Sequence, residues 1–111
     1  MTSATLGSLE LAVLLAVARL GDEAYGLAVR RDLAERTGRD YSVGAVYTTL
    51  ERLETKGFVR SHVAAPLAKR GGRSRRQFKV TAGGHRAIRR AEHTAKLVWA
   101  GVGGFLNPES A

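Results

Sequence analysis

The 111-residue sequence contains no cysteine, which excludes disulfide bridges, thiolate metal sites and a cysteine nucleophile. Its longest apolar run, Leu11 to Ala18, is much shorter than the ~20 residues that cross a bilayer, and no lysine or arginine precedes it. We therefore expect neither a membrane span nor a signal peptide. The absence of cysteine also fits a reducing cytoplasm, so we expect a cytoplasmic protein.

Acidic residues are scarce relative to basic ones: ten Asp and Glu stand against 18 Lys and Arg, for a formal charge of +8. A charge this large on so small a protein favours a polyanionic partner, and nucleic acid is the first candidate. With 44% hydrophobic and 25% charged residues, the composition is that of a folded protein and not of a disordered basic tail. The length predicts one compact core, which argues against a two-lobed enzyme.

Catalytic signatures are missing as well. His62, His85 and His93 have no cysteine partners and lack the His-Glu-x-x-His spacing of zinc enzymes. The sequence also lacks a nucleophile elbow and a phosphate-binding glycine loop. We expect surface histidines, no metal site, no cofactor and no enzymatic activity.

Apolar residues at three- and four-residue spacing predict three consecutive helices. The first covers residues 6–20 and would have Ser8 as its N-terminal cap; because it is apolar on nearly every side, we expect a partner subunit to cover part of it. The second covers residues 24–37 and stops at Gly38, where helices commonly end. The third follows Ser42 as its cap and closes at Lys56-Gly57.

Two strands and one more helix complete the predicted fold. Residues 58–63 and 77–81 favour strands, and the segment between them contains Pro66 and Gly71-Gly72, which predicts a hairpin with a long basic tip. Thr81 would cap a final helix from about residue 82 to beyond residue 100. The predicted class is mainly α with a small β-hairpin: a winged helix-turn-helix over residues 1–81, followed by a C-terminal dimerisation helix and short tail over residues 82–111.

The third predicted helix has a small, polar outer face. If Val46, Leu50 and Leu53 face the core, Gly44, Thr48 and Thr55 point away from it, with Arg52 beside them. Such a face fits a major groove about 12 Å wide, where hydroxyls and a guanidinium can reach base edges or phosphates. Glu51 and Glu54 restrict that fit to the first half of the helix. The alternative is an ordinary solvated helix face.

The hairpin carries the strongest local signal, because six cations occur within eleven residues with no acid among them: Lys69, Arg70, Arg73, Arg75, Arg76 and Lys79. Closely spaced like charges repel one another, and a bound anion relieves that repulsion. Gly71-Gly72 would let the tip lie along a groove wall or enter a narrow minor groove. The alternative is a solvated basic loop.

Four stretches of the sequence resemble the PadR-type transcriptional regulators, in the same order and spacing over about residues 6–90. They are Tyr25-Gly26-Leu27-Ala28-Val29, residues 42–54, Gly57-Phe58-Val59 and residues 76–84. The family usually has proline and alanine where this chain has Thr48 and Thr49, and an aromatic residue where it has Gln77. The base sequence read by the third helix is therefore not transferable from the family.

The resemblance implies a homodimeric repressor that binds double-stranded DNA, with the third helix in the major groove and the hairpin beside it. It places Tyr25, Ser42 and Tyr47 near the phosphate backbone. For the two tyrosines, packing between helices is the alternative. Together with the hairpin cations, the candidate DNA-binding residues are Tyr25, Ser42, Gly44, Tyr47, Thr48, Thr49 and Arg52.

The last predicted helix has an apolar stripe with the 3-4-3-4 spacing of a two-stranded coiled coil: Ile88, Ala91, Ala95, Val98, Val102 and Phe105. We expect this stripe, through Val102, to form a dimer interface together with Leu11, Leu14 and Leu15 of the first helix. The alternative is that the stripe closes the core of a single chain.

Trp99, the one tryptophan, lies at the edge of this stripe, and we expect it next to the first helix. It is either an anchor of the dimer interface or, if two final helices cross there, half of a slot for a small planar hydrophobic effector. The predicted function is a ligand-responsive homodimeric repressor that binds a palindromic operator. The alternatives are a winged-helix module for protein assembly and a small basic protein that binds nucleic acid without sequence preference.

Overall fold

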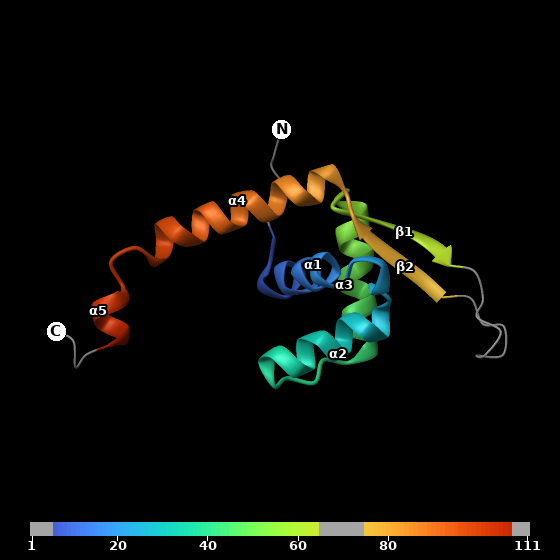
Figure 1. Cartoon of the computed structure of the whole chain (residues 1–111), viewed down its shortest axis with the longest axis horizontal. Helices are drawn as coiled ribbons and strands as arrows, with labels where there is room; N and C mark the ends of the chain where they lie inside the picture. Colours follow the sequence, from blue (N-terminus) through green and yellow to red (C-terminus); the bar gives the residue numbers. More distant parts are fainter. Residues whose placement is uncertain (1–5, 65–74, 108–111) are drawn as a thin grey trace.

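The computed structural model describes residues 6–64 and 75–107 (Figure 1). Its elements follow the chain in this order: α1 Ser8–Leu20, the 3-10 turn η1 Gly21–Glu23, α2 Gly26–Thr37, α3 Val43–Thr55, β1 Val59–Ala64, β2 Arg75–Val80, α4 Ala82–Trp99 and α5 Gly103–Leu106. Three helices, an antiparallel hairpin and a further helix form a winged helix-turn-helix, which confirms the predicted class of a mainly α fold with a small β-hairpin. No helix within these residues is long and apolar enough to cross a bilayer.

Helix α1 lies at the centre of the core. It buries Val13, Leu14, Ala16 and Val17, and it packs against α2, α3, β2 and α4. Elements β2 and α4 of the same chain thus cover part of this helix, where the sequence predicted a partner subunit. Leu14 is fully buried in that core and so cannot belong to a dimer interface, whereas Leu11 and Leu15 are half-buried.

Most helix ends lie where local chemistry predicts them. Gly38 adopts the left-handed conformation (φ 73°) that ends α2. The Ser42 hydroxyl accepts a hydrogen bond from the Ala45 amide at 3.0 Å, and Thr81 accepts one from the Gly84 amide at 3.0 Å. Both predicted caps are thereby confirmed.

The starts of α1 and α2 differ from the prediction. Gly7, and not Ser8, occupies the cap position of α1, and the Glu10 carboxylate accepts the Gly7 N–H at 2.8 Å. Helix α2 begins two residues late because Tyr25 is extended and Ala24 and Tyr25 pair with β2. The Phe78 amide donates to the Ala24 carbonyl at 2.9 Å.

The hairpin is antiparallel, with register from Val59 opposite Val80 to Ala64 opposite Arg75. Phe78 of β2 is fully buried and fixes one face of the hairpin on the core. On the opposite face, Arg60 lies directly across from Lys79, and both side chains are exposed.

Helix α4 ends at Trp99, so the prediction of one helix continuing past residue 100 is wrong. Ala100 is extended (ψ 135°) and Gly101 is left-handed (φ 82°), which separates α4 from the short α5. Val102 and Phe105 lie beyond this break and do not continue the apolar stripe. Residues 92–101 are all exposed, and the end of α4 stands clear of the core in Figure 1.

Candidate nucleic-acid interface

The outer face of α3 has the composition expected of a groove-binding surface. Val46, Leu50 and Leu53 are fully buried, while Gly44, Thr48 and Arg52 are exposed. Thr49 is an exception to the prediction: it is 5% exposed, and its hydroxyl donates to the Ala45 carbonyl at 2.7 Å. Thr49 lies beside Leu50 on the core side of the helix, so its assignment as a DNA-binding residue is wrong.

Arg75 attaches the hairpin to the start of α2. Its guanidinium lies 4.0 Å from the centroid of the half-buried Tyr25 ring, within cation–π distance. The neighbouring Gln77 side chain donates to the Asp22 carbonyl. Stacking on a ring leaves the N–H edge of a guanidinium open, so this pair can still present donors to a phosphate.

Arg76 lies on the face of the hairpin that also carries Phe78, and it connects this face to the end of α3. Its guanidinium lies 3.0 Å from the Glu54 carboxylate, which also accepts the Ser61 hydroxyl at 2.8 Å and the Ser61 amide at 3.2 Å. These hydrogen bonds hold the pKa of Glu54 below its ordinary value, and the bond from the Ser61 hydroxyl has the largest effect. Glu54 therefore faces the hairpin and not the groove-binding face.

Some cations of the hairpin have acidic partners that the sequence did not indicate. The hairpin holds no acid of its own among its basic residues, but acids from other elements reach two of its cations: Glu54 pairs with Arg76, and Asp22 lies 3.4 Å from Lys79. Lys69, Arg70 and Arg73, the other hairpin residues predicted to bind DNA, lie outside the described residues. No local pattern in the sequence indicated Glu54 and Ser61 as positioning residues, because they are separated from Arg76 by 22 and 15 residues.

Tyr47 packs on α2. A Cβ atom added to Gly26 would lie 2.3 Å from the Tyr47 ring, so the glycine is what allows this close contact. Tyr47 is half-buried, as expected of an aromatic residue packed between helices. Gly26 was not identified from the sequence as a site residue, although it lies next to Tyr25 in the stretch shared with PadR-type regulators.

The predicted dimerisation residues divide into two groups. Ile88 and Ala91 are half-buried, and Ile88 packs against the core of its own chain. Ala95 and Val98 are exposed beyond it. Trp99 is 62% exposed, so the expectation that it lies against α1 is wrong: the end of α4 projects past that helix.

The three histidines are exposed, as predicted. Among the described residues, no group of three or more His, Cys, Asp or Glu side chains is arranged to hold a metal ion.

Comparison with known proteins places the chain in a family. Residues 14–90 match the transcriptional regulator PadR-like family. The crystal structure of a PadR family transcriptional regulator from Eggerthella lenta is 30% identical, with 88% of this chain and 87% of that chain covered and a TM-score of 0.67. No curated protein matches.

Two more distant structures share the fold. A PadR-like transcriptional regulator from Bacillus cereus is 20% identical over 88% of this chain and 90% of that chain, with a TM-score of 0.71. A putative transcriptional regulator from Thermoplasma acidophilum is also 20% identical, over 89% and 94% of the two chains, with a TM-score of 0.71. On the match over residues 14–90, this chain belongs to the PadR-like family of transcriptional regulators.

Proposed function

We propose that this protein is a sequence-specific DNA-binding repressor that acts as a ligand-responsive homodimer on a palindromic operator. The observation that carries the proposal is the small, polar, exposed face of α3, with Gly44, Thr48 and Arg52, in a chain that belongs to a family of transcriptional regulators. In this proposal residues 1–81 bind DNA and residues 82–111 hold the dimer together.

The proposed interface combines base reading with phosphate contacts. Thr48 and Arg52 point outward from α3 and would reach base edges in the major groove. Ser42 is exposed at the start of that helix, and its hydroxyl has a proton to donate in addition to the lone pair used for capping. Arg75, held over Tyr25, would bind the phosphate backbone beside the groove.

Footprinting on promoter DNA tests the function directly. A twofold dimer should protect an inverted repeat with half-sites roughly one helical turn, about 10 base pairs, apart. Thr48→Ala or Arg52→Ala should change the preference at particular base pairs by ~1–3 kcal/mol, because each removes one base contact. Uniform protection of random duplex, with unchanged preferences in both variants, would instead indicate binding without sequence preference.

The two hairpin arginines should differ in their effect on salt dependence. Arg75→Ala should weaken binding to every duplex and lower the slope of log affinity against log salt by about 0.9, because one phosphate contact is lost. Arg76→Ala should change that slope less, since Glu54 already neutralises this guanidinium. Affinity titrations at several salt concentrations measure both slopes. Equal slopes in the native protein and Arg75→Ala would place Arg75 outside the interface.

For the dimer, the supporting observation is an exposed apolar cluster at the end of α4: Leu97, Val98 and Trp99. In water, neighbouring apolar side chains of this size are stabilised by burial against a partner. Leu11 and Leu15 of α1, together with Ile88, Ala91, Ala95 and Val102, remain the proposed interface residues around this cluster.

For ligand response, we assign the effector site to Trp99. If the two α4 helices of a dimer cross near this residue, their indoles would frame a slot for a planar hydrophobic compound, which would change the angle between subunits and release DNA. Titration with planar aromatic compounds should change the fluorescence of this single tryptophan and reduce operator affinity together. If neither changes, and Trp99→Ala only weakens dimerisation, Trp99 is an interface anchor.

A further inference from the structure

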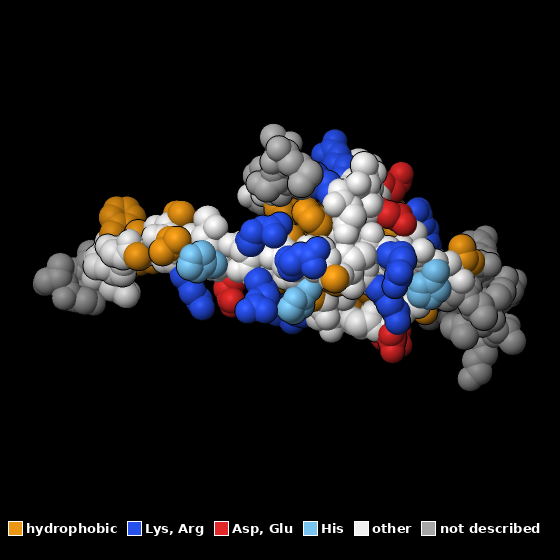
Figure 2. Space-filling model, turned by 90° about the horizontal axis from the view of Figure 1, so that it is seen from above, with side chains coloured by type: hydrophobic (Ala, Val, Ile, Leu, Met, Phe, Trp, Pro, Cys, Tyr) orange, Lys and Arg blue, Asp and Glu red, His pale blue; other side chains and the backbone are white. Residues whose placement is uncertain are grey.

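Among the residues that the structure describes, a group of exposed basic side chains without acidic partners lies on α4, away from the candidate interface. It consists of Arg86, Arg89, Arg90, His93 and Lys96, here termed the α4 stripe, and all five side chains are exposed. Seen from above α4, Lys and Arg side chains gather along the helix and again over the hairpin (Figure 2). None of the four Lys and Arg residues forms an ion pair with a described residue.

Helical geometry places these residues in one row. At 3.6 residues per turn, the stripe occupies an arc of about 120°. Glu92, the one acid of α4, falls outside this arc. From Arg86 to Lys96 the row is about 15 Å long at 1.5 Å per residue, long enough to contact more than one backbone phosphate.

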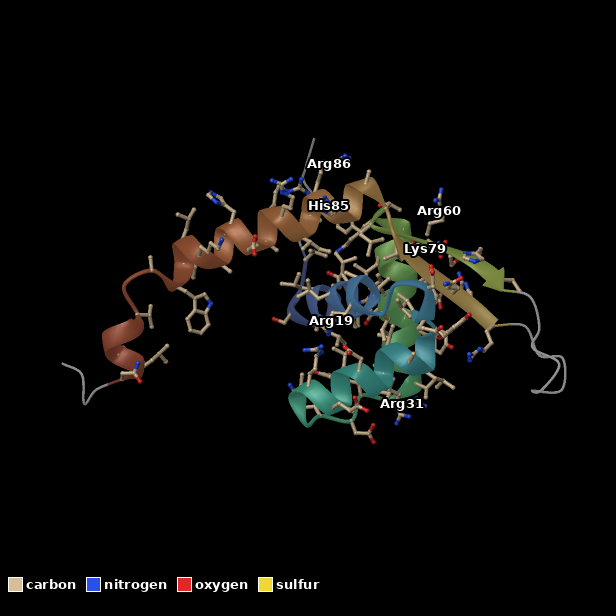
Figure 3. All side chains as sticks on the ribbon, viewed as in Figure 1. Arg19, Arg31, Arg60, Lys79, His85 and Arg86 are labelled. Carbon is tan, nitrogen blue, oxygen red and sulfur yellow. The ribbon has the colours of Figure 1, made fainter. Side chains whose placement is uncertain are left out.

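The stripe lies at the opposite end of α3 from the groove-binding half. The start of α4 meets the end of α3, where a Cβ atom on Gly83 would lie 3.3 Å from the Gly57 carbonyl. Helix α3 begins beside α2 and ends beneath the start of α4 (Figure 1). In Figure 3 the labelled Arg86 and Arg60 lie on the same side of the protein, away from α1 and α2. DNA bound at the start of α3 would therefore leave the stripe free.

The side chains of the stripe favour a duplex over other anions. Protein partners are usually anchored by buried aromatic or apolar side chains, and single strands by stacking on aromatic rings. Leu97, at the far end, is the only large apolar side chain of α4 within the arc, and α4 has no aromatic residue before Trp99. The stripe also cannot pair with its own copy across a twofold axis, because like charges would meet. A row of arginine and lysine side chains is suited to a phosphate backbone.

We propose that the α4 stripe is a second DNA-binding surface, which holds a second double-stranded segment through its phosphates, without sequence preference, while the α3 face is occupied. One protein would then connect two duplexes or fold one DNA molecule back on itself. This surface is additional to the proposed operator interface and uses none of its residues.

A capture experiment tests the stripe. Protein is bound to an immobilised duplex carrying the repeat found by footprinting, or to random duplex if no repeat is found, and a labelled random duplex is then added at about 50 mM salt. Binding to the first duplex is measured on the same surface, so failure of the operator interface and failure of the stripe are seen separately. The native protein should retain the labelled duplex and lose it as salt rises.

Two triple variants provide the comparison. Changing Arg86, Arg89 and Arg90 to alanine should reduce capture at least tenfold while binding to the first duplex changes less than twofold. Changing the same three residues to lysine keeps the charge and should keep capture. Alanine favours helix at exposed positions, so fold and oligomeric state should be retained, and circular dichroism and sedimentation test this.

Two outcomes would overturn the proposal. One is equal capture by the native protein and the triple alanine variant, which would assign bridging to other residues. The other is displacement of the labelled duplex by poly-glutamate as efficiently as by unlabelled duplex of equal charge, which would make the stripe a surface for acidic proteins.

Discussion

Val98→Glu should convert the proposed dimer into monomers and lower the affinity for an inverted-repeat operator by roughly 10²-fold to 10⁴-fold, because the advantage of two linked half-sites is lost. Val98 is 70% exposed on the single chain, between Leu97 and Trp99. Twofold symmetry would place two new carboxylates in one apolar interface. Unpaired charges are costly to remove from water, so the substitution acts on association without affecting the core of either subunit.

Sedimentation at micromolar concentration measures the first effect and operator titration the second. Ala82→Glu is the matched control: it adds the same charge to the same helix at an exposed position in the first turn, where a carboxylate interacts favourably with the helix dipole. That variant should remain a dimer. If the native protein is already a monomer, or if Val98→Glu is still dimeric, the end of α4 does not hold the dimer.

Gly84→Ala should lower the free energy of unfolding by about 3 kcal/mol, as expected when extra volume is forced into a packed region. Gly84 is buried where α4 crosses the hairpin, and a Cβ atom there would lie 2.0 Å from the Phe58 carbonyl oxygen and 2.8 Å from a methyl carbon of Val80. The carbonyl is not free to move, because it accepts the Thr81 amide at 3.0 Å. The strain must therefore shift α4 relative to the hairpin.

Chemical denaturation of the two proteins measures this loss. Gly44→Ala serves as the matched control, since its Cβ would meet open space and alanine favours helix by up to about 1 kcal/mol. Equal stability of Gly84→Ala and the native protein would show that α4 can pack differently on the hairpin. Because Gly84 fixes the direction in which α4 leaves the core, the variant should also weaken any dimer that α4 forms.

Local signals in the sequence predicted the elements well where they acted within a few residues. Ser42 and Thr81 cap their helices as predicted, and Gly38 ends α2 in the left-handed conformation. The start of α2 was predicted two residues early because the pairing of Tyr25 with Gln77 joins segments 52 residues apart, which no local pattern reveals. The end of α4 was predicted too late because its apolar spacing continues through the break at Gly101.

The candidate site also has parts that the sequence predicted and parts that it did not. The helical repeat correctly placed Thr48 and Arg52 outside and Leu50 inside, but Thr49, also predicted to bind DNA, is buried. The basic hairpin was evident from composition alone. Among the hairpin cations that the structure describes, Arg76 and Lys79 pair with Glu54 and Asp22, which come from other elements.

By itself, the sequence determined the order of the elements, the positive charge and the outward face of α3, because periodicity, caps and composition act through neighbouring residues. Only the tertiary structure decided which apolar faces stay exposed and which cations stay without an acidic partner. Burial of Leu14, the Glu54–Arg76 pair and the exposed end of α4 all depend on segments far apart in the chain. Side-chain packing and ion pairs form between groups that are close in space, and distance along the sequence does not specify that closeness.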